Sequence, residues 1–393
     1  MTPFRILVLN EISGSGLQRL PTGRYLTGKD IAEPDAILVR SADLHGIDIP
    51  ASVCAVARAG AGTNNIPVKA LSARGVPVFT APGGNANAVK EMVVAGMLMA
   101  ARNLGAAQRF VDDLSGQRAQ MEQSIEDGKK AFAGFELAGQ TLGVIGLGKV
   151  GSLVADAAIK LGMHVLGYDP DITVDAAWSL PSQVQRAASV DDVLKNARLV
   201  SLHVPLLDST RHLVNAHNLP LMQRGAVLLN FSRNGIVDDT AVVAALDARQ
   251  LGGYVCAFPH PGILRHPRVI ALPHLGASTR EAEENCAIMV VDQLMDFLEH
   301  GNVRNAVNFP QVSMRRESRW RVAIANDNVP NMLGQISTAM ARGGLNIHTM
   351  VNNSRGEMAY TLVDVDSAVG DEVLDEIRAI AGVLAVRYLP AGS

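Results

Sequence analysis

The sequence predicts an α/β protein with two doubly wound, Rossmann-like parallel-sheet domains and a C-terminal ferredoxin-like domain of βαββαβ order. Three observations support this fold class. Short apolar runs alternate with helix-like segments up to residue 301, as in parallel sheets with crossover helices. A glycine-rich turn at residue 146 joins one such run to a helical segment. After residue 318 the order of the runs becomes that of a separate small domain.

The N-terminal part contains four short apolar runs that end in small or turn-forming residues, which is typical of buried strands. These runs are 5–9, 36–40, 53–60 and 76–79. The segment from Asn87 to Leu104 is rich in Ala and Met and nearly free of residues that break helices, so it predicts a buried helix. The charged residues 105–135 predict a helical connecting arm.

The alternation of strands and helices restarts at Gly139. Residues 141–148 predict a strand that runs into a glycine turn, and residues 149–162 predict a helix. Five further apolar runs predict the other strands of this sheet: 164–170, 198–205, 225–235, 252–258 and 268–274. A long amphipathic helix is expected from Thr279, a candidate cap, to Gly301, a stop.

A linker is expected at residues 307–319, which hold a proline and clustered charges but no apolar period. Beyond it we expect strand, helix, two strands, helix and strand at 321–327, 331–344, 345–354, 357–366, 371–382 and 383–389. The predicted domains are therefore 1–97 completed by 283–310, then 98–282, then 318–393.

The composition excludes several classes of protein. The 35 Lys and Arg against 38 Asp and Glu give a net charge of −3, which argues against binding to nucleic acid. Apolar residues at 48% exclude wholesale disorder, and the longest apolar run, Met92 to Ala101, is too short to span a membrane. The N-terminus lacks a secretory signal. Because Cys54, Cys256 and Cys286 fit neither a metal site nor a disulfide pattern, we expect a cytoplasmic protein without a metal.

The glycine turn fits the dinucleotide fingerprint GxGxxG at Gly146, Gly148 and Gly151. The first glycine allows the turn, the second lets the backbone approach a pyrophosphate, and the third lets the helix meet the strand. Such turns also occur for packing alone. Here Asp169 ends the next predicted strand, near the spacing of an acid that binds a ribose 2′-hydroxyl. A carboxylate there repels a 2′-phosphate, so the sequence favours NAD over NADP.

Two further residues stand at the carboxyl ends of predicted strands, where a doubly wound sheet binds its ligands. Arg233 stands in NFSRNG, and its forked donors suit a carboxylate, although an isolated arginine is more often a solvated loop residue. His274 stands in LPHLGAST. Histidine changes charge near neutral pH, so it can pass the proton that accompanies hydride transfer to a carbonyl.

The motifs LGVIGLGKVG, SLHVP, NFSRNGIVD and PHLGAST stand in the order found in the D-2-hydroxyacid dehydrogenases, and the chain resembles that family over about residues 3–390. The resemblance implies a substrate domain, an inserted NAD domain and a C-terminal ACT domain. It implies the oxidation of 3-phosphoglycerate to 3-phosphohydroxypyruvate, the first step of serine synthesis. Two alternatives stay open: a dehydrogenase of another 2-hydroxy acid such as 2-hydroxyglutarate, and a weakly active amino-acid sensor that binds NAD.

The resemblance also assigns roles to single residues. Arg233 matches the arginine that grips the substrate carboxylate and polarises the reacting carbon, and His274 matches the acid/base. Besides these two and the three glycines, the positions that match cofactor contacts are Lys149, Val150, Asp169, Phe231, Ser232, Ala257, Leu275, Gly276 and Ala277. Arg40, Ser41 and Asn85 match contacts to the anionic groups of the substrate, and either Arg58 or Lys90 completes the phosphate pocket.

Two departures from the family concern the support of His274. Many relatives carry a glutamate just before a proline, which the segment YVCAFPHPGIL lacks, and Ala257 stands where relatives have an aspartate. No Asp or Glu occurs between Asp247 and Glu281. Because a nearby carboxylate stabilises the imidazolium, its loss predicts a pKa of His274 at or below the ordinary value of about 6.5 and a weaker acid.

The C-terminal domain offers an effector site by the same resemblance. Asn326, Asn328 and Asn346 match positions that bind L-serine in ACT domains. Asparagine can both donate and accept hydrogen bonds, which suits a zwitterionic amino acid, although asparagines in such loops often make only turn bonds. The expected partners are a small-molecule substrate, L-serine and further copies of the chain in a homodimer or homotetramer, with neither nucleic acid nor membrane.

Overall fold

The computed structural model describes residues 2–391 and divides the chain into two compact units. One unit joins Met1–Asn85 to Arg280–Ser393, and the other is Ala86–Thr279. The first break thus falls at residue 85, before the helix α3 (Ala86–Ala101), whereas the sequence placed it at residue 97, inside that helix. The reason is that α3 buries its apolar side chains in the core of the second unit.

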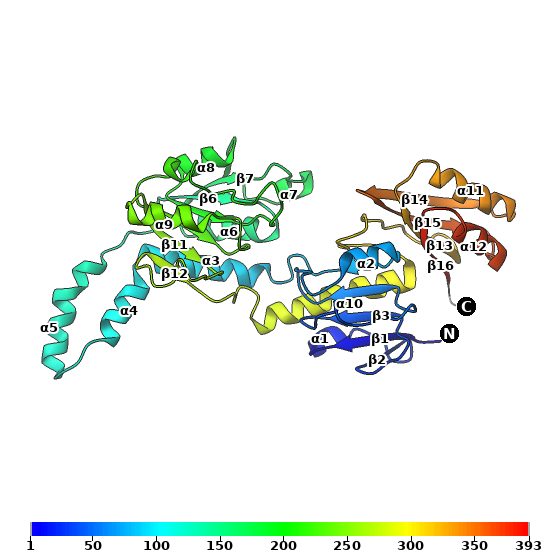
Figure 1. Ribbon diagram of the computed structural model, residues 1–393, viewed down its shortest axis with the longest axis horizontal. Coiled ribbons are helices and arrows are strands. Elements are labelled where there is room, and N and C mark those ends of the chain that lie inside the picture. Colours follow the sequence, from blue (N-terminus) through cyan, green and yellow to red (C-terminus); the bar gives the residue numbers. More distant parts are fainter. Residues whose placement is uncertain (1, 392–393) are drawn as a thin grey trace. The chain divides into compact units, whose positions relative to one another are not determined.

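The first unit begins with a five-stranded parallel sheet (Figure 1). Its strands, in spatial order, are β2 (Tyr25–Gly28), β1 (Phe4–Leu9), β3 (Ala36–Val39), β4 (Ala55–Arg58) and β5 (Val78–Phe79). The connecting helices are α1 (Gly14–Leu17) and α2 (Val68–Ala73). All four residues of β3 are buried, as expected for a parallel strand covered on both faces.

The long helix α10 (Arg280–His300) belongs to this unit and completes the core of the sheet. Its residues Val290, Val291 and Leu294 are fully buried in one apolar cluster with Ile6 and Ala55. Chain segments far apart in sequence therefore form one core, as the resemblance implied for the helix after PHLGAST.

The C-terminal domain has the predicted βαββαβ order. Its elements are β13 (Trp320–Asp327), α11 (Met332–Arg342), β14 (Ile347–Arg355), β15 (Met358–Val365), α12 (Asp371–Arg378) and β16 (Val383–Pro390). The antiparallel sheet has the order β14-β15-β13-β16, which is the ferredoxin-like arrangement. The two helices cover one face, where Ile336, Val363 and Ile377 are buried together.

The other face of this sheet is covered by the same chain. Tyr360 and Leu362 of β15 lie in the apolar cluster that contains Phe297 of α10 and Phe309 of the following segment. The Tyr360 hydroxyl donates a hydrogen bond of 2.9 Å to the carbonyl oxygen of Gly301. The C-terminal domain and the N-terminal sheet therefore share one continuous core.

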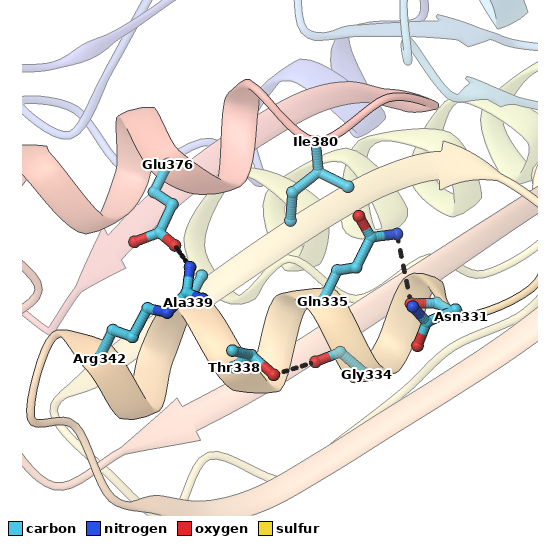
Figure 2. Close-up of a pocket in the computed structure, with 8 residues that line it drawn as sticks. All are labelled: Asn331, Gly334, Gln335, Thr338, Ala339, Arg342, Glu376 and Ile380. Atoms are coloured by element: carbon cyan, nitrogen blue, oxygen red, sulfur yellow. Dashed lines mark hydrogen bonds and ion pairs between the residues drawn. The ribbon is translucent and has the colours of Figure 1, made fainter.

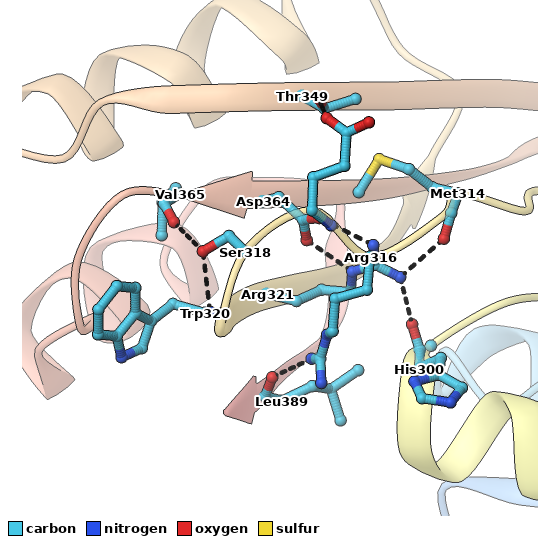
Figure 3. Close-up of polar contacts among 12 residues, drawn as sticks. His300, Met314, Arg316, Ser318, Trp320, Arg321, Thr349, Asp364, Val365 and Leu389 are labelled. Carbon is cyan, nitrogen blue, oxygen red and sulfur yellow. Dashed lines mark hydrogen bonds and ion pairs between the residues drawn. The ribbon is translucent and has the colours of Figure 1, made fainter. Parts of the chain in front are cut away.

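A buried ion pair joins the C-terminal domain to the end of α10 (Figure 3). Arg321 donates to both carboxylate oxygens of Asp364, at 2.6 and 2.9 Å, and to the carbonyl oxygens of His300 and Met314, both at 3.0 Å. The backbone N–H of Glu317 also donates to Asp364. Although burial raises the pKa of Asp364, these hydrogen bonds hold it below its ordinary value.

The second unit is a seven-stranded parallel sheet of Rossmann type. In spatial order the strands are β12 (Val269–Ala271), β11 (Leu251–Cys256), β10 (Ala226–Asn230), β9 (Leu199–Leu202), β6 (Thr141–Ile145), β7 (His164–Tyr168) and β8 (Val184–Arg186). Besides α3, its sheet is accompanied by α6 (Lys149–Lys160), α7 (Val174–Trp178), α8 (Val190–Asn196), η2 (Leu219–Leu221) and α9 (Asp239–Asp247). This order confirms the predicted doubly wound fold, with the switch point between β6 and β9.

The predicted arm is a helical hairpin that projects from the second unit (Figure 1). It consists of α4 (Leu104–Asp112), α5 (Arg118–Gly128) and η1 (Lys129–Phe132). Within this hairpin, the rings of Phe110 and Phe132 pack against each other with centroids 5.3 Å apart. None of the described helices is long and apolar enough to cross a membrane.

Candidate active site

The glycine turn has the geometry that a dinucleotide requires. Gly146 follows β6 with a φ of +92°, and a side chain there would meet the carbonyl oxygen of His203 at 2.6 Å. A side chain at Gly151 would meet the carbonyl oxygen of Gly146 at 1.9 Å, so the helix packs on the turn. Gly148, at the N-cap of α6, faces open space. The backbone N–H groups at the start of α6 are therefore accessible to a pyrophosphate, and the loop fits NAD.

Asp169 follows β7 and reaches the same turn. Its Oδ2 accepts the backbone N–H of Leu147 at 2.8 Å, and its Oδ1 accepts that of Asp171 at 3.0 Å. A carboxylate has about four acceptor positions, so two such bonds leave capacity for ribose hydroxyls. The acid that the sequence assigned to the ribose thus lies at the glycine turn.

Arg233 lies on the loop after β10, and its backbone is fixed while its side chain is exposed. Asn230 donates to the carbonyl oxygen of Arg233 at 3.0 Å and accepts the N–H of Ser232 at 3.1 Å. The Ser232 hydroxyl donates to the carbonyl oxygen of Leu202 at 2.5 Å. The guanidinium donates from Nη1 to the Ser232 carbonyl oxygen at 2.7 Å, and its further donors suit a carboxylate.

His274 lies three residues beyond β12, in the same unit as Arg233. His274 is exposed but partly desolvated, and this partial desolvation lowers its pKa, while the positive charge of Arg233 lowers it further. The structure therefore brings together the two residues that the sequence placed at the chemistry. The imidazole packs against the ring of Phe258, with centroids 4.9 Å apart.

The structure agrees with the sequence on the missing carboxylate. Among the residues described, no carboxylate contributes to the shifted pKa of His274. Ala257 is only 3% exposed and lies in the apolar core with Leu229 and Val255. An aspartate at that position would be surrounded by apolar side chains, so replacing Ala257 by aspartate would not by itself restore a carboxylate that supports His274. Within residues 2–391, no three His, Cys, Asp or Glu gather in a way that could hold a metal ion.

The other predicted cofactor positions divide by exposure. The side chains of Lys149 and Leu275 are exposed, and those of Val150, Ser232 and Ala277 are partly exposed. Phe231 is buried against the position of Gly96 in α3, and Gly276 is buried against Val89 of the same helix. These two residues shape the loops that carry Arg233 and His274.

In the first unit, the predicted anion-binding residues follow neighbouring strands. Arg40 comes directly after β3 and donates to Glu283 Oε1 of α10 at 2.6 Å. Arg58 ends β4 and donates to Asn65 at 2.9 Å. Both guanidinium groups lower the pKa of the Cys286 thiol, although burial raises it overall, so both lie near that sulfur. The unit therefore has two arginines at one edge of its sheet.

The remaining candidates of this group are less constrained. The backbone N–H of Ser41 donates to Asn10 at 3.2 Å, and its side chain is exposed. Asn85 is the last residue of the first segment of this unit and is partly exposed. Lys90 belongs to the other unit, on α3, where it pairs with Glu91 at 3.7 Å.

The three predicted effector residues lie in different settings. Asn326 is 1% exposed, with Nδ2 donating to the carbonyl oxygen of Asp327. Asn328 and Asn346 are exposed. Asn328 follows β13, near the end where Asp327 pairs with Met358. Asn346 precedes β14, at the opposite end of the sheet, where Ile347 pairs with Val365. Seven residue steps of about 3.4 Å separate these ends, so one chain does not bring Asn328 and Asn346 to one ligand.

The residues that line the cavity drawn in Figure 2 do not include Arg233 or His274. The cavity has a volume of about 380 Å³ and lies between α11 and α12 of the C-terminal domain, lined by Asn331, Gly334, Gln335, Thr338, Ala339, Arg342, Glu376 and Ile380. Its polar groups bind one another. Arg342 donates to Glu376 at 2.9 Å, and Thr338 donates to the Gly334 carbonyl oxygen at 2.7 Å.

Several residues near the candidate site were not predicted from the sequence. Glu283 on α10 pairs with Arg40, and Asn65 binds both Arg58 and the backbone of residues 40 and 42. Phe258 contacts His274. The signal for Phe258 was its place at the end of a predicted strand, but an aromatic residue there equally suits a core.

Comparison with known proteins agrees with this geometry. Residues 94–276 match the family model described as "D-isomer specific 2-hydroxyacid dehydrogenase, NAD binding domain". The D-3-phosphoglycerate dehydrogenase of Escherichia coli (strain K12) is 32% identical over 341 residues, which cover 84% of this chain and 79% of that protein. The D-3-phosphoglycerate dehydrogenase of Bacillus subtilis is 33% identical over 328 residues, covering 79% of this chain and 60% of that protein.

A solved structure with a similar fold is that of the TT0316 protein from Thermus thermophilus. It matches with a TM-score of 0.61 and 26% sequence identity, and the match covers 77% of this chain and all of that one. The family match covers the second unit almost entirely, so the glycine turn, Arg233 and His274 all lie within it or at its end.

Proposed function

The chain belongs to the D-isomer-specific 2-hydroxyacid dehydrogenases, and we propose on that basis that it oxidises 3-phospho-D-glycerate to 3-phosphohydroxypyruvate with NAD, the first step of L-serine synthesis. The observation that carries the proposal is the placement of Arg233 and His274 on loops that follow strands of one dinucleotide-binding sheet, in a chain 32% identical to a D-3-phosphoglycerate dehydrogenase. The proposed location is the cytoplasm.

The glycine turn would hold NAD, with the N–H groups at the start of α6 available to the pyrophosphate and Asp169 available to the ribose hydroxyls. The cofactor supplies the acceptor for the hydride that leaves C2 of the substrate. Because the carboxylate of Asp169 repels a 2′-phosphate, NAD is preferred over NADP. Lys149, Val150, Ser232, Leu275 and Ala277 complete the contacts.

His274 takes the proton of the C2 hydroxyl as C2 becomes a carbonyl, and Arg233 holds the substrate carboxylate through two parallel hydrogen bonds. The lowered pKa of His274 keeps the imidazole neutral at pH 7, which is the form that accepts a proton. The residue is thus suited to the oxidation of the hydroxy acid more than to the reverse reaction.

The phosphate group requires further positive charge in the first unit. Arg40, Ser41 and Asn85 are the residues assigned by family resemblance. Of the two candidates for an additional basic residue, Arg58 is favoured over Lys90, because its guanidinium and that of Arg40 act on the same thiol of Cys286. Glu283 neutralises part of this charge until an anion binds.

The C-terminal domain is proposed to be an ACT domain that binds L-serine. Asn328 and Asn346 lie at opposite ends of its sheet, so a site that uses both requires two copies of the chain. This supports a homodimer or homotetramer. The exposed apolar residues Leu104 and Val111 of α4, both near half exposed, give the arm a surface for a second copy.

A second candidate function is that of a weakly active amino-acid sensor that binds NAD. The absence of a carboxylate among the groups that act on His274 favours it. Turnover measured beside an NAD titration separates the two: the sensor binds NAD tightly but oxidises 3-phosphoglycerate hardly faster than the His274→Ala variant does.

The deciding experiment is an assay of the purified protein with NAD and either 3-phosphoglycerate or 2-hydroxyglutarate. Oxidation of 3-phosphoglycerate with a higher kcat/KM than 2-hydroxyglutarate, lost in His274→Ala, is expected. Equal or higher kcat/KM with 2-hydroxyglutarate would assign the protein to another substrate of the same family.

A further inference from the structure

The segment after β11 takes the place where relatives carry the glutamate that supports the catalytic histidine. Here the residue before Pro261 is His260. Its Nε2 lies 2.9 Å from Asp239 Oδ2, and its Nδ1 accepts the backbone N–H of Gly262 at 3.1 Å. Nδ1 is thus bound by the segment itself, and Nε2 faces Asp239 at ion-pair distance without an aligned hydrogen bond, so the direct role of the glutamate does not pass to His260.

The group that packs against His274 is instead aromatic. The ring of Phe258 lies with its centroid 4.9 Å from that of His274, at an interplanar angle of 52°. Both residues leave neighbouring parallel strands, because Cys256 of β11 pairs with Ala271 of β12. Phe258 also packs on the apolar core that contains Val255 and Phe231, and this packing restricts the position of its ring.

The turn that carries Phe258 is held at two points. The first is the strand β11, which ends two residues before it. The second is the Asp239–His260 ion pair, two residues after it. Asp239 belongs to the first turn of α9, and the hydroxyl of the buried Tyr254 lies 3.4 Å from its Oδ1. A carboxylate fixed on both sides by regular elements thus holds His260, and with it the turn.

We propose that Phe258 is a positioning residue for hydride transfer: its ring holds the imidazole of His274, and the Asp239–His260 ion pair fixes the turn that presents this ring. The inference rests on the proposed dehydrogenase activity. In this arrangement the imidazole of His274 is oriented by packing against an aromatic ring and not by a charged partner. Packing restricts the ring of His274 without stabilising its protonated form.

The kinetic test compares Phe258→Ala, Phe258→Tyr, Asp239→Asn and His260→Gln with the parent. Phe258→Ala is expected to lower kcat by about 10–100-fold, since misplacement of a reacting group by 1 Å costs on that order. The KM for substrate and the Kd for NAD change less than about twofold, and Phe258→Tyr recovers most of the rate. Asp239→Asn and His260→Gln lower kcat by roughly 3–10-fold.

The matched control is Asp247→Asn, which removes the partner of His266 in a second His–Asp pair of the same unit, at 3.3 Å. Its kcat is expected to equal that of the parent. In a His274→Ala background, Phe258→Ala has no further effect, because the two residues act as one unit. A parental kcat in Phe258→Ala, or effects that add independently in the double variant, would overturn the proposal. So would a loss of NAD binding and of Tm in parallel with kcat, which marks a purely structural role.

A second measurement does not depend on turnover. The imidazole signal of His274, followed by NMR against pH, reports both the ring current of Phe258 and the local burial. In Phe258→Ala the signal shifts and the pKa rises toward its ordinary value, because burial now opposes protonation less, while the charge of Arg233 is unchanged. The same signal and pKa in parent and variant would refute the contact even if the protein proved to act on another substrate.

Discussion

Arg233 and His274 follow strands of one sheet, and the guanidinium of the first adds to burial in lowering the pKa of the second. The residue proposed to bind the substrate carboxylate thus also favours the neutral form of the proposed proton acceptor. In that proposal, one positive charge acts on both substrate binding and the protonation state of the base.

The pH dependence of the two directions is the first prediction. Oxidation needs neutral His274, so its kcat/KM is expected to stay at its plateau from pH 8 down to below about 6.5, the ordinary pKa of histidine. Reduction of the keto acid needs the imidazolium and falls as the pH rises through the lowered pKa. Rate profiles in both directions check this, and an inflection above pH 6.5 would contradict it.

The second prediction concerns the fork of Arg233. Arg233→Lys keeps the charge but loses the two parallel hydrogen bonds, so kcat/KM for the hydroxy acid is expected to fall by about 10–100-fold. The Kd for NAD stays within about twofold. Arg224→Lys, at an exposed arginine before β10, is the control and is expected to behave like the parent. An unchanged kcat/KM in Arg233→Lys would show that Arg233 is an ordinary solvated loop residue without a role in substrate binding.

The third prediction concerns Asp169 and cofactor choice. Asp169→Ala combined with Asp171→Arg removes the repulsion of a 2′-phosphate and is expected to shift the NAD/NADP preference by roughly 10–100-fold toward NADP. Asp169→Asn is the control, because its side chain still accepts the N–H of Leu147 while the charge is lost. Steady-state kinetics with both cofactors measure the effect. Equal use of NAD and NADP by the parent would show that Asp169 does not select the cofactor.

A fourth prediction concerns acid stability. Burial lowers the pKa of His203 to about 4, and its Nε2 lies 2.8 Å from the Ser201 hydroxyl. The unfolded chain takes up a proton at this site below about pH 6.5 and the folded chain does not, so stability falls as the pH drops from about 6.5 to about 4. The loss reaches about 3 kcal/mol at most.

Urea unfolding at several pH values tests this in His203→Gln and in the exposed-site control His217→Gln. The slope of the free energy of unfolding between pH 4 and pH 6.5 is expected to be smaller in His203→Gln only. The same slope in both variants would mean that His203 is protonated in the folded protein.

The fifth prediction concerns the buried ion pair of the C-terminal domain. Arg321→Leu leaves the carboxylate of Asp364 buried without its partner, which is expected to cost about 3–5 kcal/mol of unfolding free energy. Leucine at both positions costs less, because no buried charge remains. The exposed pair Arg342–Glu376 is the control, and Arg342→Leu is expected to cost under about 1 kcal/mol. Equal costs for the two single variants would contradict the prediction.

The fold was largely predictable because the central strands are continuous apolar runs. β3, β9 and β10 are buried over their whole length, and such runs are visible without a structure. The strands β2 and β8 were not predicted. They lie at sheet edges and expose most of their side chains, so no apolar pattern marks them.

The candidate site was predictable only where a residue type has one dominant chemistry. The glycine turn, Asp169, Arg233 and His274 could be placed from strand ends and motif spacing. Contacts such as Phe258 with His274 and Arg40 with Glu283 depend on how the chain packs, and Glu283 lies 243 residues from Arg40. The burial of Asn326 was equally hidden, because the residue stands near the end of a predicted strand and the sequence does not show that its side chain is covered.

The shared core of the N-terminal sheet and the C-terminal domain has a practical consequence for protein engineering. Deleting the C-terminal domain would bare Phe297 and Phe309, which are each 1% exposed in the full chain. A patch of that kind promotes aggregation. A shortened gene would therefore yield a product that aggregates, and variants that probe the role of the C-terminal domain should alter single residues and keep its backbone intact.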